Sequence, residues 1–391
     1  ENFMKKHSNL FIPGIIMVGI VLRTPFAVLS IVLSDIADGL HISLSSLGLL
    51  TSLPLVMFAL CSSFSPRLAQ KFGLEKLFTL VLIALTIGSL IRIINLPFLY
   101  IGTVILGAAI ALLNVLLPSI IQANQPHRIG LLTTLYISAM SLSITLASAV
   151  VVSIVNATSW QGLILVLTAV CLVAFLVWLP NTKYNHFLER KGKNQPIGAL
   201  LKNKKVLALI VFCGLQSLLF YTAMTWLPTL ALQAGLSKDA SGVLASVFSL
   251  ISLPFSMTIP SLTARLSARG RLVMISCVAA SGLLGVSMLL VSTNNFLYWL
   301  LLNLLIGAAV SALFPYLMVT FSLKTSTSEQ TAQLSGLAQT GGYILAALGP
   351  SLFGFSFDFF HSWTPAIIGL LILTVIMTAS LFYIEKFDKI L

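Results

Sequence analysis

The most informative scarcity in this chain is that of charge. Of its 391 residues only 8% are Asp, Glu, Lys or Arg, whereas 58% are hydrophobic and the mean hydropathy is +1.04. Soluble globular proteins carry about 25% charged residues. The composition therefore excludes a soluble protein and indicates an integral membrane protein.

Groups that perform chemistry are also scarce. The four cysteines, Cys61, Cys171, Cys213 and Cys277, lie in apolar runs without paired spacing, so we interpret them as packing residues. The apolar runs hold no Ser/His/Asp set and no metal-spaced His/Glu cluster, and no glycine loop of phosphate-binding type is present. We therefore expect no catalytic residue, no metal, no cofactor and no enzymatic activity.

Acidic residues are missing from the middle of every apolar run, and the five histidines lie in or near loops. Proton-driven transporters usually need a buried group that alternates between protonation states. A proton relay through carboxylates is therefore not expected.

What the sequence does contain is a series of apolar runs about 20 residues long, the length of helix that crosses a bilayer. The first run follows Lys5 and Lys6 but contains Arg23 and lacks a cleavage site, so we interpret it as a retained helix rather than a signal peptide. The runs predict an all-α membrane protein with helices near residues 10–34, 45–65, 76–95, 97–122, 129–155, 160–180, 204–233, 239–262, 272–292, 296–322, 331–357 and 363–384.

The basic residues are distributed unevenly between the loops. Of 22 Lys and Arg, all but Arg23, Arg92 and Lys238 fall on one side of the predicted membrane. The positive-inside rule makes that side cytoplasmic and places both termini there. The net charge of +12 therefore indicates orientation in the membrane. We expect the protein to interact with the lipid bilayer and not with nucleic acid.

A polar segment at 181–203 divides the chain into two predicted six-helix bundles, 1–180 and 204–391. Shifting the sequence by about half its length supports two pseudo-symmetric halves, because it aligns several residues in the same order: Pro66 with Pro260, Lys71 with Arg265, Gly107-Ala108-Ala109 with Gly307-Ala308-Ala309, and Ser159-Trp160 with Ser362-Trp363. An even number of helices in each half predicts a parallel repeat with its axis along the membrane normal.

This architecture resembles the major facilitator superfamily (MFS), and local motifs resemble its cyanate and nitroimidazole permease (CynX/NimT) branch. The motifs are VLRTP at 21–25, LLTSLPLVMFAL, SPRLAQKFGLEK, GAAIALLNVLLP, FCGLQSLLFYTAMTWLPTL and SGLAQTGGYILAALGPSLFG. The loop motif between helices 2 and 3 departs from the superfamily pattern, since Pro66 replaces its first glycine and Gln70 its carboxylate. The resemblance implies a monomeric transporter in the bacterial inner membrane, with helices 1, 4, 7 and 10 lining a central cavity.

Arg23 is the first candidate site residue. A guanidinium keeps its proton, and inside a membrane it is expensive unless it faces protein or a watery cavity. On a helix it shares a face with Phe26, Ala27 and Ser30. The alternative is a structural arginine bonded to the carbonyls of a helix broken near Pro25.

The remaining polar candidates are few. Each could contact a solute or, as the alternative, join helices by hydrogen bonds: Asn114, Gln216, Tyr221, Gln339 and Tyr343. Trp226 could contact the solute or belong to an interfacial aromatic belt. Arg92 we interpret as snorkelling to the membrane surface or as part of a structural pair.

These residues predict a transporter that binds a small anionic or strongly polar solute between its two bundles. The resemblance narrows the solute to a cyanate-like anion or a nitroazole. The alternatives are a multidrug-type exporter of amphipathic compounds, which the many phenylalanines permit, and a membrane sensor that binds a ligand without moving it.

Overall fold

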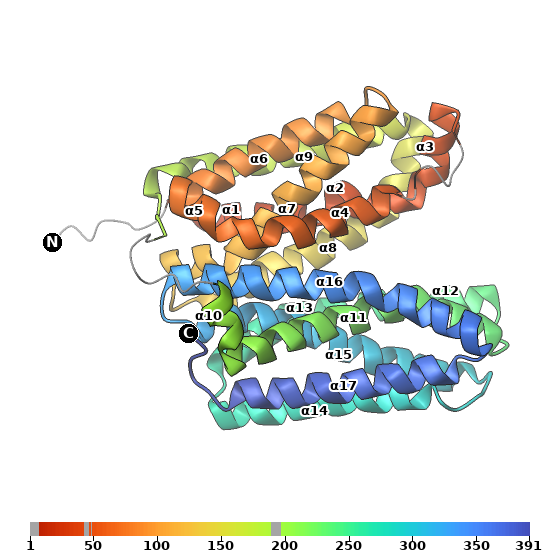
Figure 1. Cartoon of the computed structure of the whole chain (residues 1–391). Coiled ribbons are helices and arrows are strands. Elements are labelled where there is room, and N and C mark those ends of the chain that lie inside the picture. The colour runs from red at the N-terminus through yellow and green to blue at the C-terminus, as the bar shows by residue number, and fades with distance from the viewer. Residues whose placement is uncertain (1–7, 43–46, 48, 189–196) are drawn as a thin grey trace. The chain divides into compact units, whose positions relative to one another are not determined.

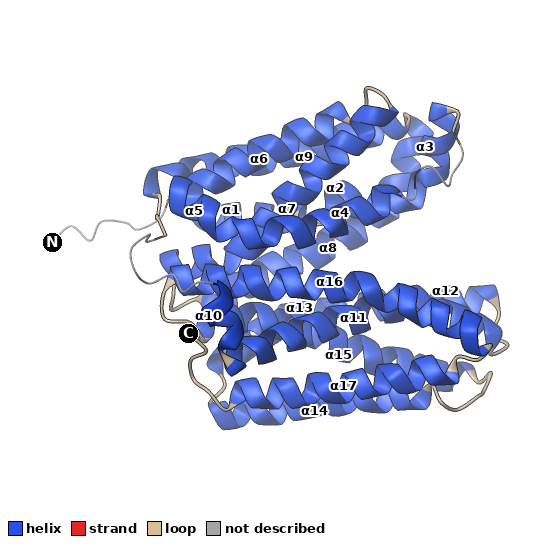
Figure 2. Cartoon of the chain, viewed as in Figure 1, coloured by secondary structure: helices blue, strands red, loops and turns tan. Residues whose placement is uncertain are grey.

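The computed structural model describes residues 8–42, 47, 49–188 and 197–391, and these residues form helices joined by short loops (Figures 1 and 2). Lys5, Lys6 and the middle of the predicted linker lie outside this range. Packing divides the chain into unit 1, residues 1–194 with 327–336, and unit 2, residues 195–326 with 337–391. Each unit is described separately.

Unit 1 is built from twelve described helical segments. They are α1 (Phe11–Val21), α2 (Thr24–Ala27), η1 (Val28–Val32), α3 (Leu33–Leu40), α4 (Leu49–Cys61), η3 (Ser62–Phe64), α5 (Ser65–Phe72), α6 (Leu74–Ile91), α7 (Leu96–Asn124), α8 (Ile129–Ala157), α9 (Trp160–Trp178) and η4 (Leu179–Tyr184). The segments η1, η3 and η4 are 3₁₀ helices.

Unit 2 holds the other helices. They are α10 (Ile197–Lys202), α11 (Lys204–Gln233), α12 (Lys238–Leu250), α13 (Ser252–Arg265), α14 (Ala268–Met288), α15 (Phe296–Leu323), α16 (Ser328–Phe360) and α17 (Thr364–Glu385). The first turns of α16, up to Gly336, pack with unit 1.

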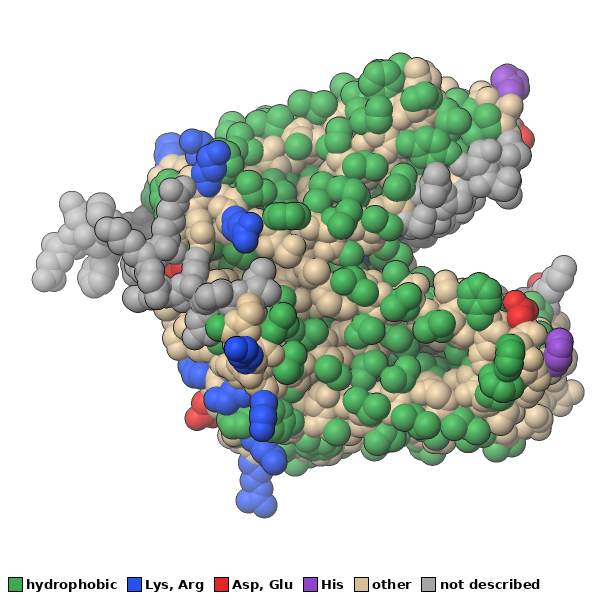
Figure 3. Space-filling view, viewed as in Figure 1, with side chains coloured by type: hydrophobic (Ala, Val, Ile, Leu, Met, Phe, Trp, Pro, Cys, Tyr) green, Lys and Arg blue, Asp and Glu red, His purple; other side chains and the backbone are tan. Residues whose placement is uncertain are grey.

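The all-α, multi-span prediction is confirmed. Among the described residues, 10 helices are long and apolar enough to cross a membrane, and Phe11–Ala27 forms a shorter apolar segment. Each of the twelve predicted spans coincides with helical structure, the second through α4 to α5 and the eighth through α12 and α13. Large apolar side chains cover the flanks of both units (Figure 3), as expected of surfaces that face lipid.

Side-chain caps define where several helices begin. Asn95 accepts from Phe98 N at the start of α7, and Asn295 accepts from Leu297 N at the start of α15. Serines perform the same function at the starts of α9, α12 and α14, where they accept from the amides of Gly162, Ala240 and Gly270. These residues satisfy amides that have no partner within their own helix.

The two units repeat one packing pattern. In unit 1, α7 packs on α4 and α6, and α9 packs on α6 and α1; in unit 2, α15 packs on α12, α13 and α14, and α17 packs on α14 and α11. Gly107 lies against Pro54 and Met57 of α4, whereas Gly307 lies against Phe248 of α12 and against Ile251, which follows this helix. The repeated glycines therefore permit close approach of corresponding helices.

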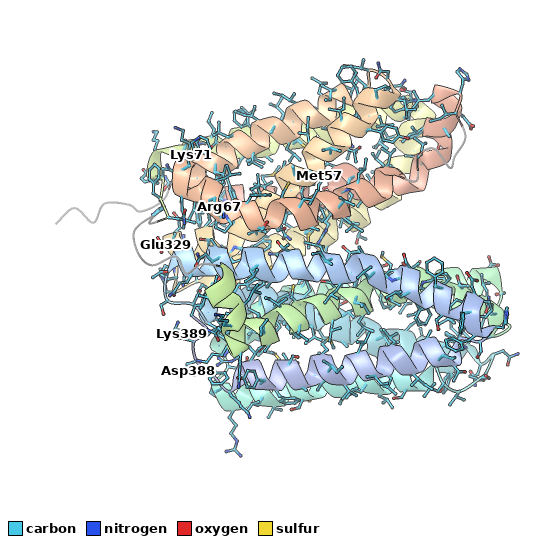
Figure 4. All side chains as sticks on the ribbon, viewed as in Figure 1. Met57, Arg67, Lys71, Glu329, Asp388 and Lys389 are labelled. Atoms are coloured by element: carbon cyan, nitrogen blue, oxygen red, sulfur yellow. The ribbon has the colours of Figure 1, made fainter. Side chains whose placement is uncertain are left out.

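Basic side chains gather at one end of each unit, which we name its basic end (Figure 3). Arg67 and Lys71 lie on α5 at the basic end of unit 1, and Asp388 and Lys389 follow α17 at that of unit 2 (Figure 4). The loops at the other ends of the helices are nearly free of lysine and arginine, as the sequence predicts.

Candidate functional site

Arg23 lies at a break in the first membrane segment. The sequence predicts one continuous helix over 10–34, but α1 ends at Val21 and α2 begins at Thr24. Pro25 has no N–H, so it cannot donate to the carbonyl of Val21 four residues earlier. Thr24 Oγ1 donates instead to the carbonyl of Ile20. The physical cause of the break is therefore the proline within the RTP sequence.

The side chain of Arg23 is partly buried and lies over the ring of Phe58. Its guanidinium carbon lies 5.8 Å from the centroid of the Phe58 ring on α4, within the range of a cation–π contact. The rings of Phe26 and Phe58 meet edge to face at 5.8 Å. Phe26 N and Ala27 N donate to Arg23 O, so the expected proximity of Arg23 and Phe26 holds locally, whereas the side chain of Ser30 lies outside the described residues.

Phe58 is a residue that the sequence analysis does not single out. Its side chain is buried, and in the sequence it is one apolar residue among many in the second span. Only its position beneath the guanidinium distinguishes it from ordinary packing residues.

Asn114 lies in the middle of α7 and is buried. The α7 helix contacts both α2 and α4, the elements that carry Arg23, Phe26 and Phe58. Pro118 follows one turn later within the same helix. The structure therefore places Asn114 on a helix that packs beside the Arg23 segment.

Two predicted residues of unit 2 lie on α11. Gln216 is buried, and its Nε2 donates to Val310 O of α15 at 3.1 Å. Tyr221 is partly buried and meets Phe220 edge to face at 5.1 Å, while Phe220 stacks on Phe248 of α12. Gln216 thus forms an interhelical hydrogen bond, and Tyr221 belongs to an aromatic row.

Gln339 and Tyr343 of α16 line the same small cavity in unit 2. The cavity has a volume of about 10 Å³, and its wall also includes Ser217 and Phe314. A space of this size holds about one water molecule. The structure therefore brings together two predicted residues and the neighbour of a third, Gln216, around one small and mostly apolar space.

Trp226 lies in a cluster of aromatic side chains. Its Nε1 donates to Pro350 O at 2.8 Å, and its ring lies 5.2 Å from Trp363 and 6.1 Å from Phe353. Gly354 makes room for the indole, since a Cβ there would lie 2.6 Å from Trp226 Cζ2. The indole N–H of Trp226 is therefore hydrogen-bonded to α16.

A larger open cavity of about 620 Å³ lies at the end of unit 2 opposite its basic end. It is lined by the ends and loops of α11, α14, α16 and α17, including Gln233, Asn294 and Trp363. It contains none of the predicted site residues. The larger of these two cavities therefore does not coincide with the predicted site residues.

At the basic end of unit 1, Glu75 forms a buried polar cluster. Its carboxylate accepts from His186 N at 2.6 Å and from Asn124 Nδ2 at 2.8 Å, and Oε1 lies 2.7 Å from His186 Nδ1. Asn185 accepts from Lys76 N and donates to Phe72 O. These bonds fasten the first residues of the linker to the start of α6.

Unit 2 carries a related cluster around Glu385. Arg271 Nε donates to its carboxylate at 3.2 Å, Lys324 Nζ lies 3.8 Å away, and Tyr316 OH donates to Oε1. Burial lowers the pKa of Lys324, and the nearby Glu385 carboxylate acts in the opposite direction. The carboxylates of Glu75 and Glu385 thus lie near helix ends, where each joins elements of its own unit.

Comparison with known proteins identifies relatives along the whole chain. A sequence profile of the Major Facilitator Superfamily matches residues 15–350. The "Uncharacterized transporter YycB" of Bacillus subtilis (strain 168) is 32% identical, with 96% of this chain and 93% of the relative covered. The "2-nitroimidazole transporter" of Escherichia coli (strain K12) is 31% identical over 95% of this chain and 94% of its own length.

Three further comparisons agree. The "Cyanate transport protein CynX" of Escherichia coli (strain K12) is 22% identical over 92% of this chain and 95% of its own length. Among solved structures, the proton:xylose symporter XylE aligns with a TM-score of 0.75 at 14% identity, over 97% of this chain and 95% of XylE. FucP in the outward conformation aligns with a TM-score of 0.73 at 13% identity, over 96% of this chain and 99% of FucP.

The fold, the repeated helix packing and the sequence relatives lead to one assignment, and they confirm that this is a membrane transporter rather than an enzyme. The chain belongs to the major facilitator superfamily, in its cyanate and nitroimidazole permease (CynX/NimT) branch.

Proposed function

We propose that the protein carries a small anionic or strongly polar solute, of the cyanate-like anion or nitroazole class, across the cell membrane by alternating access. The observation that carries this proposal is the position of Arg23, a permanent cation at a helix break within a membrane segment. Its guanidinium lies over the ring of Phe58, which in turn contacts Phe26. A guanidinium matches flat anions through paired N–H donors.

The relatives support the same solute class. One relative named above is a 2-nitroimidazole transporter and another a cyanate transport protein. Both solutes are small; 2-nitroimidazole is planar, and cyanate is a linear anion. A guanidinium attracts an anion or an acceptor such as a nitro group, whereas it would repel a lipophilic cation.

The remaining candidates divide into two sets by unit. In unit 1, we propose that Arg23 recognises charge, with Phe26 and Asn114 beside it. In unit 2, the proposed contacts are Gln216, Tyr221, Gln339 and Tyr343, together with the ring of Trp226. Gln339 and Tyr343 lie together on the wall of one small cavity, so a solute that contacts one of them could contact the other.

Orientation and assembly are part of the proposal. The basic ends of both units would face the cytoplasm, because lysine and arginine are retained on that side of a membrane. Both termini would then be cytoplasmic, in a bacterial inner membrane, and the protein would act as a monomer.

The test is uptake by liposomes that contain only this protein. We expect labelled cyanate or 2-nitroimidazole to accumulate or exchange, and Arg23→Ala to abolish that flux while insertion and folding stay intact. Arg23→Lys should restore little, because an ammonium cannot form the planar paired contact. The control is Arg269→Ala, which removes the same charge from an exposed position in the first turn of α14.

Three outcomes would contradict the proposal. Wild-type flux through a stable Arg23→Ala protein would remove Arg23 from the site. Binding of either probe without flux would argue for a sensor, and flux restricted to unrelated lipophilic cations would argue for an exporter of amphipathic compounds.

A further inference from the structure

The second arginine of unit 1 within an apolar stretch, Arg92, is completely buried at the end of α6. Its Nη1 donates to Pro25 O at 2.7 Å, its Nη2 to Ser89 Oγ at 2.8 Å and its Nε to Ser89 O at 3.3 Å. This side chain does not snorkel to a membrane surface. It joins α6 to the short segment α2 that follows Arg23.

The fold makes dedicated room for this side chain. A Cβ at Gly102 of α7 would lie 2.5 Å from Arg92 Cγ and 2.4 Å from Gly88 O. The absence of side chains at Gly88 and Gly102 lets α6 and α7 approach closely, and the stem of Arg92 lies against Gly102. An apolar residue could fill the same space without the cost of burying a charge.

The guanidinium of Arg92, unlike an apolar side chain, supplies a hydrogen-bond donor to the carbonyl of Pro25. In a continuous α-helix, Pro25 O would accept from the amide of Leu29, but here the chain enters the 3₁₀ segment η1 at Val28. Arg92 supplies a charge-assisted hydrogen bond, which is stronger than a neutral one. Ser89 Oγ also lies 2.7 Å from Thr168 Oγ1 of α9, so α2, α6 and α9 are joined at this point.

The carbonyl that Arg92 binds lies between the two residues proposed to meet the solute, because Pro25 stands two residues after Arg23 and one before Phe26. We infer that Arg92 is a positioning residue that holds the start of α2 and thereby sets the orientation of Arg23 and Phe26. This inference rests on the proposed role of Arg23.

The test is a double-mutant cycle in purified full-length protein, with the equilibrium affinity for cyanate and 2-nitroimidazole as the readout. Arg92→Met keeps an unbranched apolar stem against Gly102 and removes the donors of the guanidinium. We expect it to weaken binding about tenfold, within the range measured for coupled residues. Arg92→Lys, which can still donate to Pro25 O, should recover part of this loss.

The cycle separates positioning from general damage. In an Arg23→Ala background, Arg92→Met should weaken binding much less than in the wild-type background, because only Phe26 is left to orient. Equal losses in both backgrounds would overturn the inference, and so would unchanged affinity accompanied by a lower melting temperature. If Arg92→Met does not fold, Ser89→Ala removes one acceptor of Arg92 and the link to Thr168, and it should show the same dependence on Arg23.

Failure of the inference differs from failure of the proposed function. If Arg23→Ala alone leaves the affinity unchanged, the proposed role of Arg23 is wrong and the inference is lost with it. If Arg23→Ala weakens binding and Arg92→Met does not, only the inference is wrong.

Discussion

Replacing Glu75 should selectively weaken the basic end of unit 1. The side chain of Glu75 is 1% exposed, and its carboxylate accepts hydrogen bonds from His186 N and Asn124 Nδ2, with His186 Nδ1 also 2.7 Å away. Glu75→Ala removes the acceptor for all of these groups. Glu75→Gln keeps one oxygen but presents an NH₂ group to a donor.

The expected magnitude follows from these contacts. Leaving a buried donor without its acceptor costs about 1 to 3 kcal/mol, and a single hydrogen bond to a charged group contributes about 1.5 to 3 kcal/mol. Glu75→Ala removes the acceptor of Asn124 Nδ2 and of His186 N, so we expect it to lower the free energy of unfolding by about 2 to 6 kcal/mol. Glu75→Gln should lower it by about 1.5 to 3 kcal/mol.

The assay is unfolding in mixed micelles with an increasing fraction of dodecyl sulfate, followed by tryptophan fluorescence. Trp178 is a local reporter, since its buried Nε1 donates to Glu75 O at 3.0 Å. The matched control is Lys76→Ala. The Lys76 side chain is exposed, and its contact with Asn185 uses the backbone amide, which the substitution retains.

The result that would refute this reasoning is a Glu75→Ala protein that unfolds at the same detergent fraction as Lys76→Ala. That result would mean that the cluster contributes no net stability, because desolvation of the carboxylate cancels its hydrogen bonds.

Two further predictions use the same unfolding assay. Gly19→Ala should destabilise the protein by about 1 to 3 kcal/mol, because its Cβ would lie 2.4 Å from Tyr136 O. Gly369→Ala, whose Cβ would have no atom within 4 Å, should stabilise the protein by up to about 1 kcal/mol. Equal shifts in both variants would contradict this reasoning. Trp226→Phe removes the hydrogen bond to Pro350 O and should lower the free energy of unfolding by about 0.5 to 1.5 kcal/mol. Uptake should be retained, because an aromatic ring remains. A loss of uptake without a loss of stability would instead assign the indole N–H to the solute.

The sequence predicts the twelve spans well, because span length and hydropathy are local properties. It also contains the cause of the break in the first span, since Pro25 is visible in it, although a single helix over 10–34 is the expected form. The position of the 3₁₀ segment after α2 depends on contacts with other helices. Those contacts are not encoded locally.

The surroundings of the candidate residues are harder to predict. The contact between His186 and Glu75 joins residues 111 positions apart, and the contact between Arg92 and Pro25 joins residues 67 apart. A phenylalanine such as Phe58 carries no signal that separates it from its apolar neighbours. The polar residues of apolar spans can therefore be found in the sequence, whereas their partners require the fold.

The most direct test of the account compares the affinities of an anion and a neutral molecule of the same shape, in wild-type protein and in Arg23→Ala. If Arg23 recognises the charge of the solute, the wild-type protein should prefer the anion by about 10- to 150-fold, the factor that corresponds to one hydrogen bond to a charged group. The preference should vanish in Arg23→Ala. An equal preference for the anion in both proteins would show that a group other than Arg23 recognises the charge of the solute.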